Sequence, residues 1–481
     1  MKHTFFKSLM MPALAAILLA TGCTKKIDDA FANPNALTKQ PVEELLPGVI
    51  SNMAIQHSAN GTLYGPQNDG LYFGRYVQFW ATNGTGNQYD QMGDNFINRS
   101  DILGPSYQER YNALYRGGIT VTTTLDAAAQ AKAEKAAKDK LPANRTGIQS
   151  SLVSLETSTG ALRALVGGPG FVPGRTEVNL ALRRRQTGSS IKMFVLTAAL
   201  EAGVQASDLI DGTLPCTLPN PGLPEEPFKI TKGVSHPVSP LAEQTWLSIN
   251  CAYARLAQVV GLDKVVALMY GMMSSDFMPK PEWGTDAERL NLIKPYASLS
   301  TGANELSPLD MASGAQTIAN LGVHHEPYFV EKIEDATGVI YQHELNPDQA
   351  LSEASALRSV DALKGVLKFG TARRTQLDGG RPAAGKTGTQ DDNTNAWFVG
   401  FTRELTTAVW VGDPRAYTPM VNIPEFVKAD GYTRIQGAMY PARIWKQLMD
   451  EALGNTPVNE LFWGMDENFI RKIFRIIVVH N

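Results

Sequence analysis

Three short polar motifs, in a fixed order along the chain, constrain this sequence more than any other feature. Each combines a hydroxyl with an amine or an amide, and they are S-x-x-K at Ser189 to Lys192, S-x-N at Ser248 to Asn250, and Lys386-Thr387-Gly388-Thr389. The gaps between them are 59 and 138 residues. Each pattern alone occurs by chance in many chains, so the chemistry rests on a fold that brings all three together.

The first motif predicts an activated nucleophile. Ser189 and Lys192 lie three residues apart at the start of an apolar helical run, so they share one helix face. A serine hydroxyl attacks well only when a neighbour removes its proton. Lys192 can do so if burial and nearby cations lower its pKa, and the helix N-terminus adds partial positive charge where an anion forms.

The other two motifs supply groups for the substrate. Ser248 could relay a proton between Lys192 and a leaving amine, and Asn250 could bind a substrate amide and accept a hydrogen bond from Lys192. The third motif is typical of a strand with a bare glycine, Gly388, which permits close backbone approach. Lys386 is a cation for a substrate carboxylate. The N–H groups near Thr389 and Ser189 could form an oxyanion hole.

Around these motifs, residues 119–455 alternate between strand and helix patterns. Strands are predicted at 119–124, 151–155, 161–166 and 395–412; helices at 189–202, 241–260 and 263–273, and after Asp126 as N-cap through Leu141. Strands at both ends of a helical middle predict an α+β domain whose sheet closes by non-local pairing. A net charge of −3 without a basic stripe argues against nucleic-acid binding.

The motif set resembles that of penicillin-binding proteins and serine β-lactamases. Further stretches resemble the transpeptidase domain of class A penicillin-binding proteins over about 119–455; they are Thr122 to Asp126, Gly167-Gly168, Arg184 to Gln186, Ala198 to Gly203, Ser307 to Ala312 and Ala396 to Gly400. The resemblance implies an antiparallel sheet with helices on both sides. It also implies a D,D-transpeptidase that uses no cofactor or metal, acts on peptidoglycan stem peptides and is acylated by β-lactams.

The resemblance also assigns roles to the motif residues. It makes Ser189 the acylated nucleophile and Lys192 its base, with Ser248 and Asn250 as the second-motif pair. It gives carboxylate binding to the third motif; these residues are Lys386, Thr387 and Thr389, with Gly388 allowing the strand to approach. A class A protein also carries a glycosyltransferase domain. No glutamate-centred motif for that activity is visible, so polymerisation of glycan strands is not predicted.

The N-terminus predicts export. Residues 1–22 combine early lysines with a short apolar run, as a signal peptide does. The segment Leu18 to Cys23 resembles a bacterial lipobox, which implies lipidation of Cys23 and a membrane-anchored protein that faces the periplasm or cell envelope. An ordinary signal peptide with an incidental cysteine is the alternative. The other cysteines, Cys216 and Cys251, could form one disulfide, but sequence does not show whether they approach.

Residues 23–118 are rich in aromatic, Asn, Gln and Gly residues, and are predicted to form a small, mostly helical fragment. They resemble the start of SusD/RagB-like outer-membrane lipoproteins, through Asn33-Pro34-Asn35, Leu45 to Gly48 and Tyr72 to Tyr76. This leaves open a glycan-binding lipoprotein fragment within a mosaic chain. The tail, 456–481, has no predicted role.

Two further alternatives share the motif set. A serine β-lactamase needs a base for its deacylating water, and Glu288 to Asn291 is a faint candidate for it. A β-lactam sensor would be acylated without catalysing transpeptidation.

Overall fold

The structure is a computed structural model that describes residues 118–170, 176, 178–221, 223–273 and 293–458. Several predicted features lie outside these residues: the signal peptide, Cys23, the SusD/RagB-like fragment, Glu288 to Asn291 and most of the tail.

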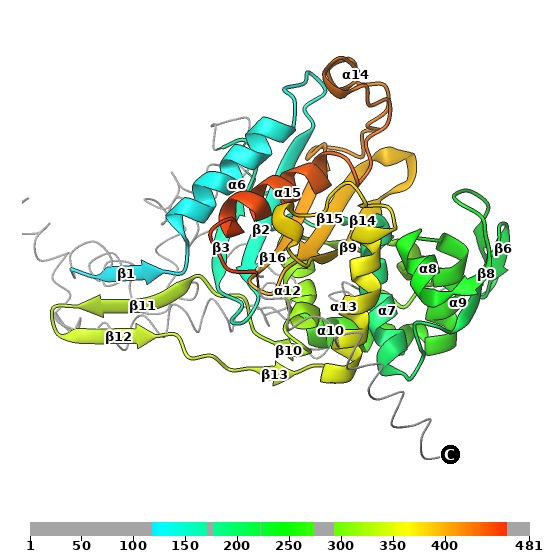
Figure 1. Cartoon of the computed structure of the whole chain (residues 1–481), viewed down its shortest axis with the longest axis horizontal. Coiled ribbons are helices and arrows are strands. Elements are labelled where there is room, and N and C mark those ends of the chain that lie inside the picture. Colours follow the sequence, from blue (N-terminus) through cyan, green and yellow to red (C-terminus); the bar gives the residue numbers. More distant parts are fainter. Residues whose placement is uncertain (1–117, 171–175, 177, 222, 274–292, 459–481) are drawn as a thin grey trace, which may run out of the picture.

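A five-stranded antiparallel sheet forms the centre of the fold (Figure 1). Its spatial order is β14 (Ala384–Thr389), β15 (Asn395–Phe401), β16 (Leu405–Gly412), β2 (Gln149–Glu156) and β3 (Leu162–Val166). Pairing of β16 with β2 joins strands more than 240 residues apart, for example Val409 with Leu152. The predicted closure of the sheet by non-local pairing is therefore confirmed.

Helices cover both faces of this sheet. On one face lie α6 (Ala127–Lys140) and α15 (Tyr440–Leu453), and on the other lies α12 (Pro308–Ala319). The predicted N-cap Asp126 accepts hydrogen bonds from the backbone N–H groups of Ala128 and Ala129. Because helices bury both faces, every residue of β15 is buried, and its sequence shows no polar alternation.

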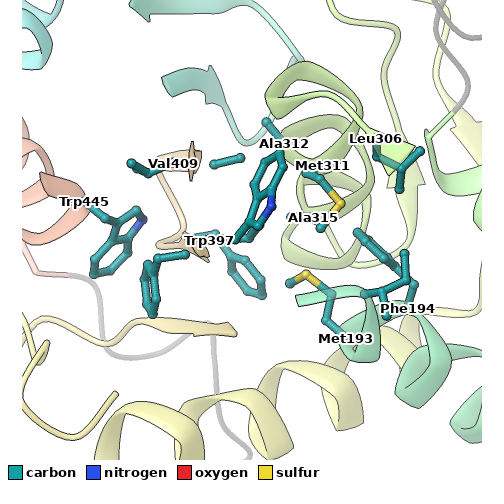
Figure 2. Packing of buried hydrophobic residues seen from close by; sticks show 14 of the residues in the cluster. Met193, Phe194, Leu306, Met311, Ala312, Ala315, Trp397, Val409 and Trp445 are labelled. Atoms are coloured by element: carbon teal, nitrogen blue, oxygen red, sulfur yellow. The ribbon is translucent and has the colours of Figure 1, made fainter. Parts of the chain in front are cut away.

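The side chains of β15 divide between the two faces. Phe398 packs edge-on against Trp445 of α15 at 5.0 Å, whereas Trp397 donates a hydrogen bond from Nε1 to the Gln186 carbonyl on the other side. Figure 2 shows Trp397 and Trp445 in one continuous core with Met193, Phe194 and α12. This packing fixes the sheet relative to the segment that carries the first motif.

The helical middle of the domain lies beside the edge strand β14. It consists of η3 (Gly188–Ile191), α7 (Lys192–Glu201), α8 (Leu241–Trp246), α9 (Asn250–Val260), α10 (Leu262–Met273), η4 (Ala297–Thr301) and α13 (Glu353–Lys368). The prediction of one helix over 241–260 is wrong. The chain breaks between α8 and α9, because Ser248 adopts φ 61°, which a right-handed helix does not allow.

The remaining elements are short. Strands β1 (Thr120–Thr123), β11 (Val330–Asp335) and β12 (Gly338–Gln342) form a separate sheet. The two-stranded pairs are β4 (Arg185–Gln186) with β9 (Glu305–Leu306), β5 (Leu209–Gly212) with β8 (His236–Pro240), β6 (Cys216–Leu218) with β7 (Phe228–Ile230), and β10 (Val323–His324) with β13 (Asp348–Gln349). The short helices are η5 (Asp378–Gly380), η6 (Asp391–Asn393) and α14 (Pro424–Asp430).

A disulfide joins Cys216 of β6 to Cys251 of α9, with their Cα atoms 6.0 Å apart. The pairing that the sequence left open is therefore formed. Within the described residues, no single helix is long and apolar enough to cross a membrane; α9 and α10 meet that test only as a pair bent by 93°. In the same part of the chain, no group of three or more His, Cys, Asp and Glu side chains could hold a metal ion.

Candidate active site

The first and third motifs meet through their backbones. Gly188 adopts φ 52°, and a Cβ on it would lie 2.6 Å from the backbone carbonyl of Thr389. A Cβ on Gly388 would lie 2.4 Å from the Thr187 carbonyl oxygen and 2.8 Å from Ser190 Oγ. Neither position has room for a side chain, so both must be glycine. The close backbone approach predicted at Gly388 is therefore present. The backbone beside Ser189 consequently packs directly on β14.

Neighbouring contacts fix this junction. Gly188 donates its N–H to the carbonyl of Gly302, 3.2 Å away, and a Cβ on Gly302 would come within 2.0 Å of the Gly188 oxygen. On the far side of β14, the Gly437 N–H donates to Thr389 Oγ1 at 3.1 Å. Thr389 thus has its hydroxyl partly engaged by the protein itself.

The second motif occupies the break between α8 and α9 and is reached by both motif lysines. Lys192 Nζ donates hydrogen bonds to the Ser248 carbonyl and to Asn250 Oδ1, each at 2.7 Å. Lys386 Nζ donates to Ser248 Oγ at 2.8 Å, and Lys192 Nζ lies 3.5 Å from the same oxygen. The contact between Asn250 and Lys192 that the sequence predicted is present. Ser248 Oγ lies between the two amines.

Burial changes the charge of both amines. The Lys192 and Lys386 side chains are fully buried, and loss of solvation lowers the pKa of Lys192 well below its usual value. The positive charge of Lys386 lowers it further. Burial lowers the pKa of Lys386 to about 7. The lowered pKa favours the uncharged amine, which can donate its N–H groups to the two oxygens at 2.7 Å and keep a lone pair.

Ser189 is partly open to solvent, as are Ser248 and Thr389. It lies in η3, one residue before the buried Ser190, whose Oγ donates to the Thr187 carbonyl at 2.7 Å. Among the residues that the structure describes, no hydrogen bond joins Ser189 Oγ to Lys192 Nζ. Such contacts between nucleophile and base often tighten only when a substrate binds.

A link that the sequence did not predict joins the end of α8, next to the second motif, to the third motif. Thr371, just after α13, shares a hydrogen bond of 2.7 Å between its Oγ1 and that of Thr387, and its N–H donates to the Trp246 carbonyl at 3.0 Å. A Cβ on Gly370 would lie 2.3 Å from the same carbonyl oxygen. A single threonine hydroxyl in a turn is not a motif, so Thr371 gave no signal in the sequence.

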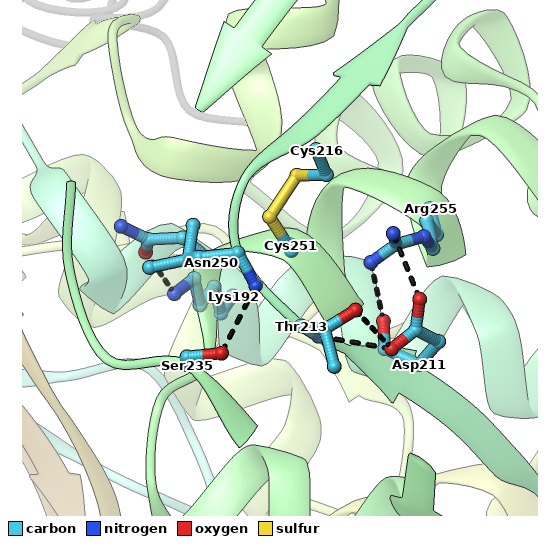
Figure 3. The surroundings of a disulfide bond; sticks show 9 residues. Lys192, Asp211, Thr213, Cys216, Ser235, Asn250, Cys251 and Arg255 are labelled. Carbon is cyan, nitrogen blue, oxygen red and sulfur yellow. Dashed lines mark hydrogen bonds and ion pairs between the residues drawn. A yellow bond between two sulfur atoms is a disulfide. The ribbon is translucent and has the colours of Figure 1, made fainter. Parts of the chain in front are cut away.

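Figure 3 shows the disulfide beside the second motif. Cys251 directly follows Asn250, and the amide of Asn250 points to Lys192. The backbone N–H of Leu214 donates to Ser235 Oγ at 3.0 Å, which connects the two ends of the segment that holds β6 and β7.

Comparisons with known proteins identify the family of the domain that carries these motifs. Residues 150–416 match the family model of the penicillin-binding protein transpeptidase domain. Penicillin-binding protein 1A of Mycobacterium tuberculosis is 33% identical over 359 residues, which are 72% of this chain and 41% of that protein. The chain spans about two fifths of the length of such curated relatives.

Solved structures are also similar. Penicillin-binding protein PonA1 from Mycobacterium tuberculosis has a TM-score of 0.63 at 30% identity, covering 73% of this chain and 89% of that one. The PonA1 protein in complex with penicillin V has a TM-score of 0.61 at 32% identity, covering 73% of this chain and 91% of that one. The predicted α+β fold, with an antiparallel sheet between helices, is confirmed.

Proposed function

Since the chain belongs to the penicillin-binding protein transpeptidase family, we propose that it is a D,D-transpeptidase that cross-links peptidoglycan stem peptides through a serine acyl-enzyme. The observation that carries this proposal is the fully buried Lys192, whose pKa burial lowers well below its usual value and whose Nζ is held by the second motif. An uncharged amine with a free lone pair is the base that a serine nucleophile needs.

The acylation step follows from these contacts. Ser189 Oγ attacks the carbonyl of the penultimate D-Ala, and its proton passes to Lys192 Nζ. The bond from that carbonyl carbon to the nitrogen of the last D-Ala breaks, and the leaving amine takes a proton. Ser248 Oγ is placed to pass it on, because it lies 3.5 Å from Lys192 Nζ and 2.8 Å from Lys386 Nζ.

The acyl-enzyme is then resolved by an amine from a second stem peptide. The amine attacks the ester carbon, its extra proton returns through Lys192, and the bond to Ser189 Oγ breaks. A peptide bond thus forms between two strands, and the free serine is restored.

Substrate binding is assigned to the third motif and Asn250. Strand β14 is an edge strand, paired only with β15 in its sheet, so an extended peptide can add along its open side. We assign the substrate carboxylate to Lys386, Thr387 and Thr389. Because burial brings the pKa of Lys386 to about 7, a carboxylate beside it favours the charged form. The N–H groups of Ser189 and Thr389 are assigned to the oxyanion hole.

The setting of the enzyme is also proposed. Relatives named penicillin-binding protein 1A are cell-envelope enzymes, which supports a catalytic domain that faces the periplasm. A lipid anchor at Cys23 stays a prediction. The comparisons give no support to the prediction that this chain lacks glycosyltransferase activity. Covalent binding of β-lactams is supported by a structural neighbour in complex with penicillin V.

The experiment is intact-mass analysis of the full chain after brief exposure to benzylpenicillin. We expect one persistent adduct of the drug's mass, which Ser189→Ala abolishes. Ser190→Ala is the matched control, because it removes the adjacent hydroxyl and leaves Ser189 in place. Loss of drug without an adduct would identify a β-lactamase, and an unmodified chain with intact drug would refute the acylating serine.

A second measurement separates a transpeptidase from a sensor. A peptide that ends in D-Ala-D-Ala is incubated with the full chain and an acceptor amine. We expect release of D-Ala and a new peptide product, both absent with Ser189→Ala. Acylation by penicillin without either product would identify a sensor.

A further inference from the structure

The Cys216–Cys251 disulfide lies beside the second motif but outside the chemistry described above. Cys251 is the second residue of α9, fully buried, and follows Asn250 directly. Its partner, Cys216, begins the β6–β7 hairpin and is also buried. The bond therefore ties the first turn of α9 to a hairpin that contributes no motif residue.

The first turn of α9 lacks a side-chain cap. Its N-cap, Ile249, makes no side-chain hydrogen bond to the helix start. The residue before it, Ser248, has φ 61°, a conformation in which residues other than glycine are strained. Such a turn persists only when its surroundings hold it. The adjacent disulfide is a covalent restraint at that point.

The hairpin has its own small core. Cys216, Ile230, Cys251 and Ala254 form a hydrophobic cluster that is separate from the main core of the domain. Leu214, Leu218 and Phe228 pack against it. So small a cluster buries little apolar surface, and the disulfide is the strongest link between the hairpin and α9.

The segment after the hairpin then reaches the amide of Asn250. Gly233, with φ 125°, lies so close that a Cβ on it would be 3.3 Å from Asn250 Nδ2. Asn250 Oδ1 meanwhile accepts the hydrogen bond from Lys192. The disulfide is thus connected to Asn250 in two ways. One is the backbone, through Cys251, and the other is the segment after the hairpin, whose Gly233 lies close to the Asn250 amide.

From this geometry we propose that the Cys216–Cys251 disulfide is a positioning element of the acylation site, which holds Asn250 and Ser248 where they bind Lys192. The inference rests on the proposed function. Cys216 and Cys251 touch no reacting atom and act through Asn250 and Ser248. Because acylation depends on placement to within about 1 Å, loss of the tie lowers the rate of the chemical step.

The test is the first-order rate constant of acylation at saturating benzylpenicillin, measured by quenched intact-mass analysis of the full chain. This constant does not depend on the fraction of protein that is folded, so a purely structural role would leave it unchanged. Cys216→Ala breaks the bond and leaves the sequence of α9 intact. We expect the constant to fall by about tenfold or more.

Gln258→Ala is the matched control. Gln258 Nε2 donates to the Pro219 carbonyl at 2.9 Å, so it joins the same helix to the same hairpin, two turns beyond Asn250. Its loss should leave the rate constant within about twofold of wild type. Melting temperatures of both variants are recorded in parallel.

Reduction of the wild-type chain provides the second arm and decides the question if Cys216→Ala does not fold. Dithiothreitol supplies two electrons and two protons, becomes its cyclic disulfide and leaves Cys216 and Cys251 as thiols, which iodoacetamide labelling detects as two sites more than in the untreated chain. We expect the same loss of rate, reversed when the disulfide is oxidised again. A rate constant within about twofold of wild type in the folded variant, or in the reduced chain, would overturn the inference. No adduct on the wild type would overturn the proposed function as well.

Discussion

The two walls of the site are built in different ways. The glycine wall, formed by Gly188 and Gly302 against Gly388 and Thr389, is an assembly of backbones in direct contact. The polar wall, formed by Ser248 and Asn250 at the break between α8 and α9, is joined to the rest through lysine amines. The glycine wall can form only where Gly188, Gly302 and Gly388 carry no side chain. The polar wall is held by hydrogen bonds to the polar atoms of Ser248 and Asn250.

The difference separates placement from chemistry. A backbone contact leaves no room for an added carbon, so the glycine wall sets where Ser189 lies relative to β14. The polar wall tolerates exchange of one polar side chain for another of the same shape. Such an exchange changes the charge of the wall and the proton affinity of the lysine bonded to it. Variants of the glycine wall should therefore damage fold and activity together, whereas variants of the polar wall should separate them.

The largest effect is expected for Gly188→Ala. The added carbon would lie 2.6 Å from the backbone of Thr389, at a residue with φ 52°. We expect the acylation rate to fall about hundredfold or more, with a loss of several kcal/mol, about 3 or more, in unfolding free energy.

Gly203→Ala is the control for backbone strain. Gly203 has φ 96° and no atom within 4 Å of the added carbon, so it isolates strain from collision. It should cost about 1–2 kcal/mol in urea unfolding and leave acylation per folded molecule unchanged. Equal effects of the two substitutions on acylation would remove the distinction between the walls.

The polar wall is tested by Asn250→Asp. The new carboxylate would lie where Oδ1 now stands, 2.7 Å from Lys192 Nζ, and it favours the ammonium form. The pKa of Lys192 therefore rises, and the limb along which acylation declines as pH falls moves to higher pH. At neutral pH we expect a loss of about tenfold to hundredfold, which recovers as the pH is raised.

The pH profile of the first-order acylation constant measures this shift, and circular dichroism verifies that the fold is kept. A loss that is equal at every pH would show that Asn250 does not control the proton affinity of Lys192.

Lys386→Met tests the polar wall through stability. In the folded chain Lys386 has a pKa of about 7, against 10.5 for an unperturbed lysine. Between these values the unfolded chain holds a proton that the folded chain lacks, so stability rises with pH by about 1.4 kcal/mol per unit. Below pH 7 this contribution no longer changes. Lys386→Met removes the rise of unfolding free energy with pH that Lys386 causes. The variant is also more stable near neutral pH, since methionine fills the space without a buried charge.

Urea unfolding at pH 7, 8 and 9 measures how the unfolding free energy changes with pH in the wild type and in Lys386→Met. Lys192, whose pKa is also lowered, contributes a slope of the same sign in both proteins, because burial is the larger cause of its shift and the substitution leaves that burial in place. The smaller part of the shift, which comes from the Lys386 charge, is lost in the variant. Parallel slopes in the two proteins would mean that Lys386 is charged throughout this range.

Residue type and spacing predicted much of the sheet and of the glycine wall. The apolar runs of β2 and β3, the cap at Asp126 and the bare glycine of β14 are local features, and each is confirmed. The second motif also meets both motif lysines, as the resemblance to penicillin-binding proteins implied. Local pattern suffices where local chemistry decides the structure.

The polar wall was harder to predict. The apolar spacing of 241–260 runs on without interruption, and nothing in the residue type of Ser248 signals φ 61°. The pairing of Cys216 with Cys251 depends on a distance that sequence does not carry. Convergence of both lysines on Ser248 Oγ depends on the tertiary arrangement of three segments. These features are fixed by packing, so they appear only in the structure.

The smallest effect is expected at the link between the walls. Thr371 joins the Trp246 carbonyl, two residues before Ser248, to Thr387 Oγ1 on β14. Thr371→Val keeps the shape and the backbone bond but removes the hydroxyl. It leaves Thr387 Oγ1 without its partner at 2.7 Å, at a cost of about 1 kcal/mol. We expect acylation by benzylpenicillin to slow about threefold to tenfold, mainly through weaker binding of the drug before acylation.

Thr371→Ser separates the hydroxyl from the rest of the side chain. It restores the hydrogen bond but not the methyl group, so it should return the apparent affinity to near the wild-type value. Saturation curves of acylation rate against benzylpenicillin concentration measure affinity and rate constant separately. If Thr371→Val and Thr371→Ser gave the same curve, the hydroxyl bridge would have no part in placing Thr387, and the two walls would be coupled through the backbone contacts of Gly370 and Trp246 alone.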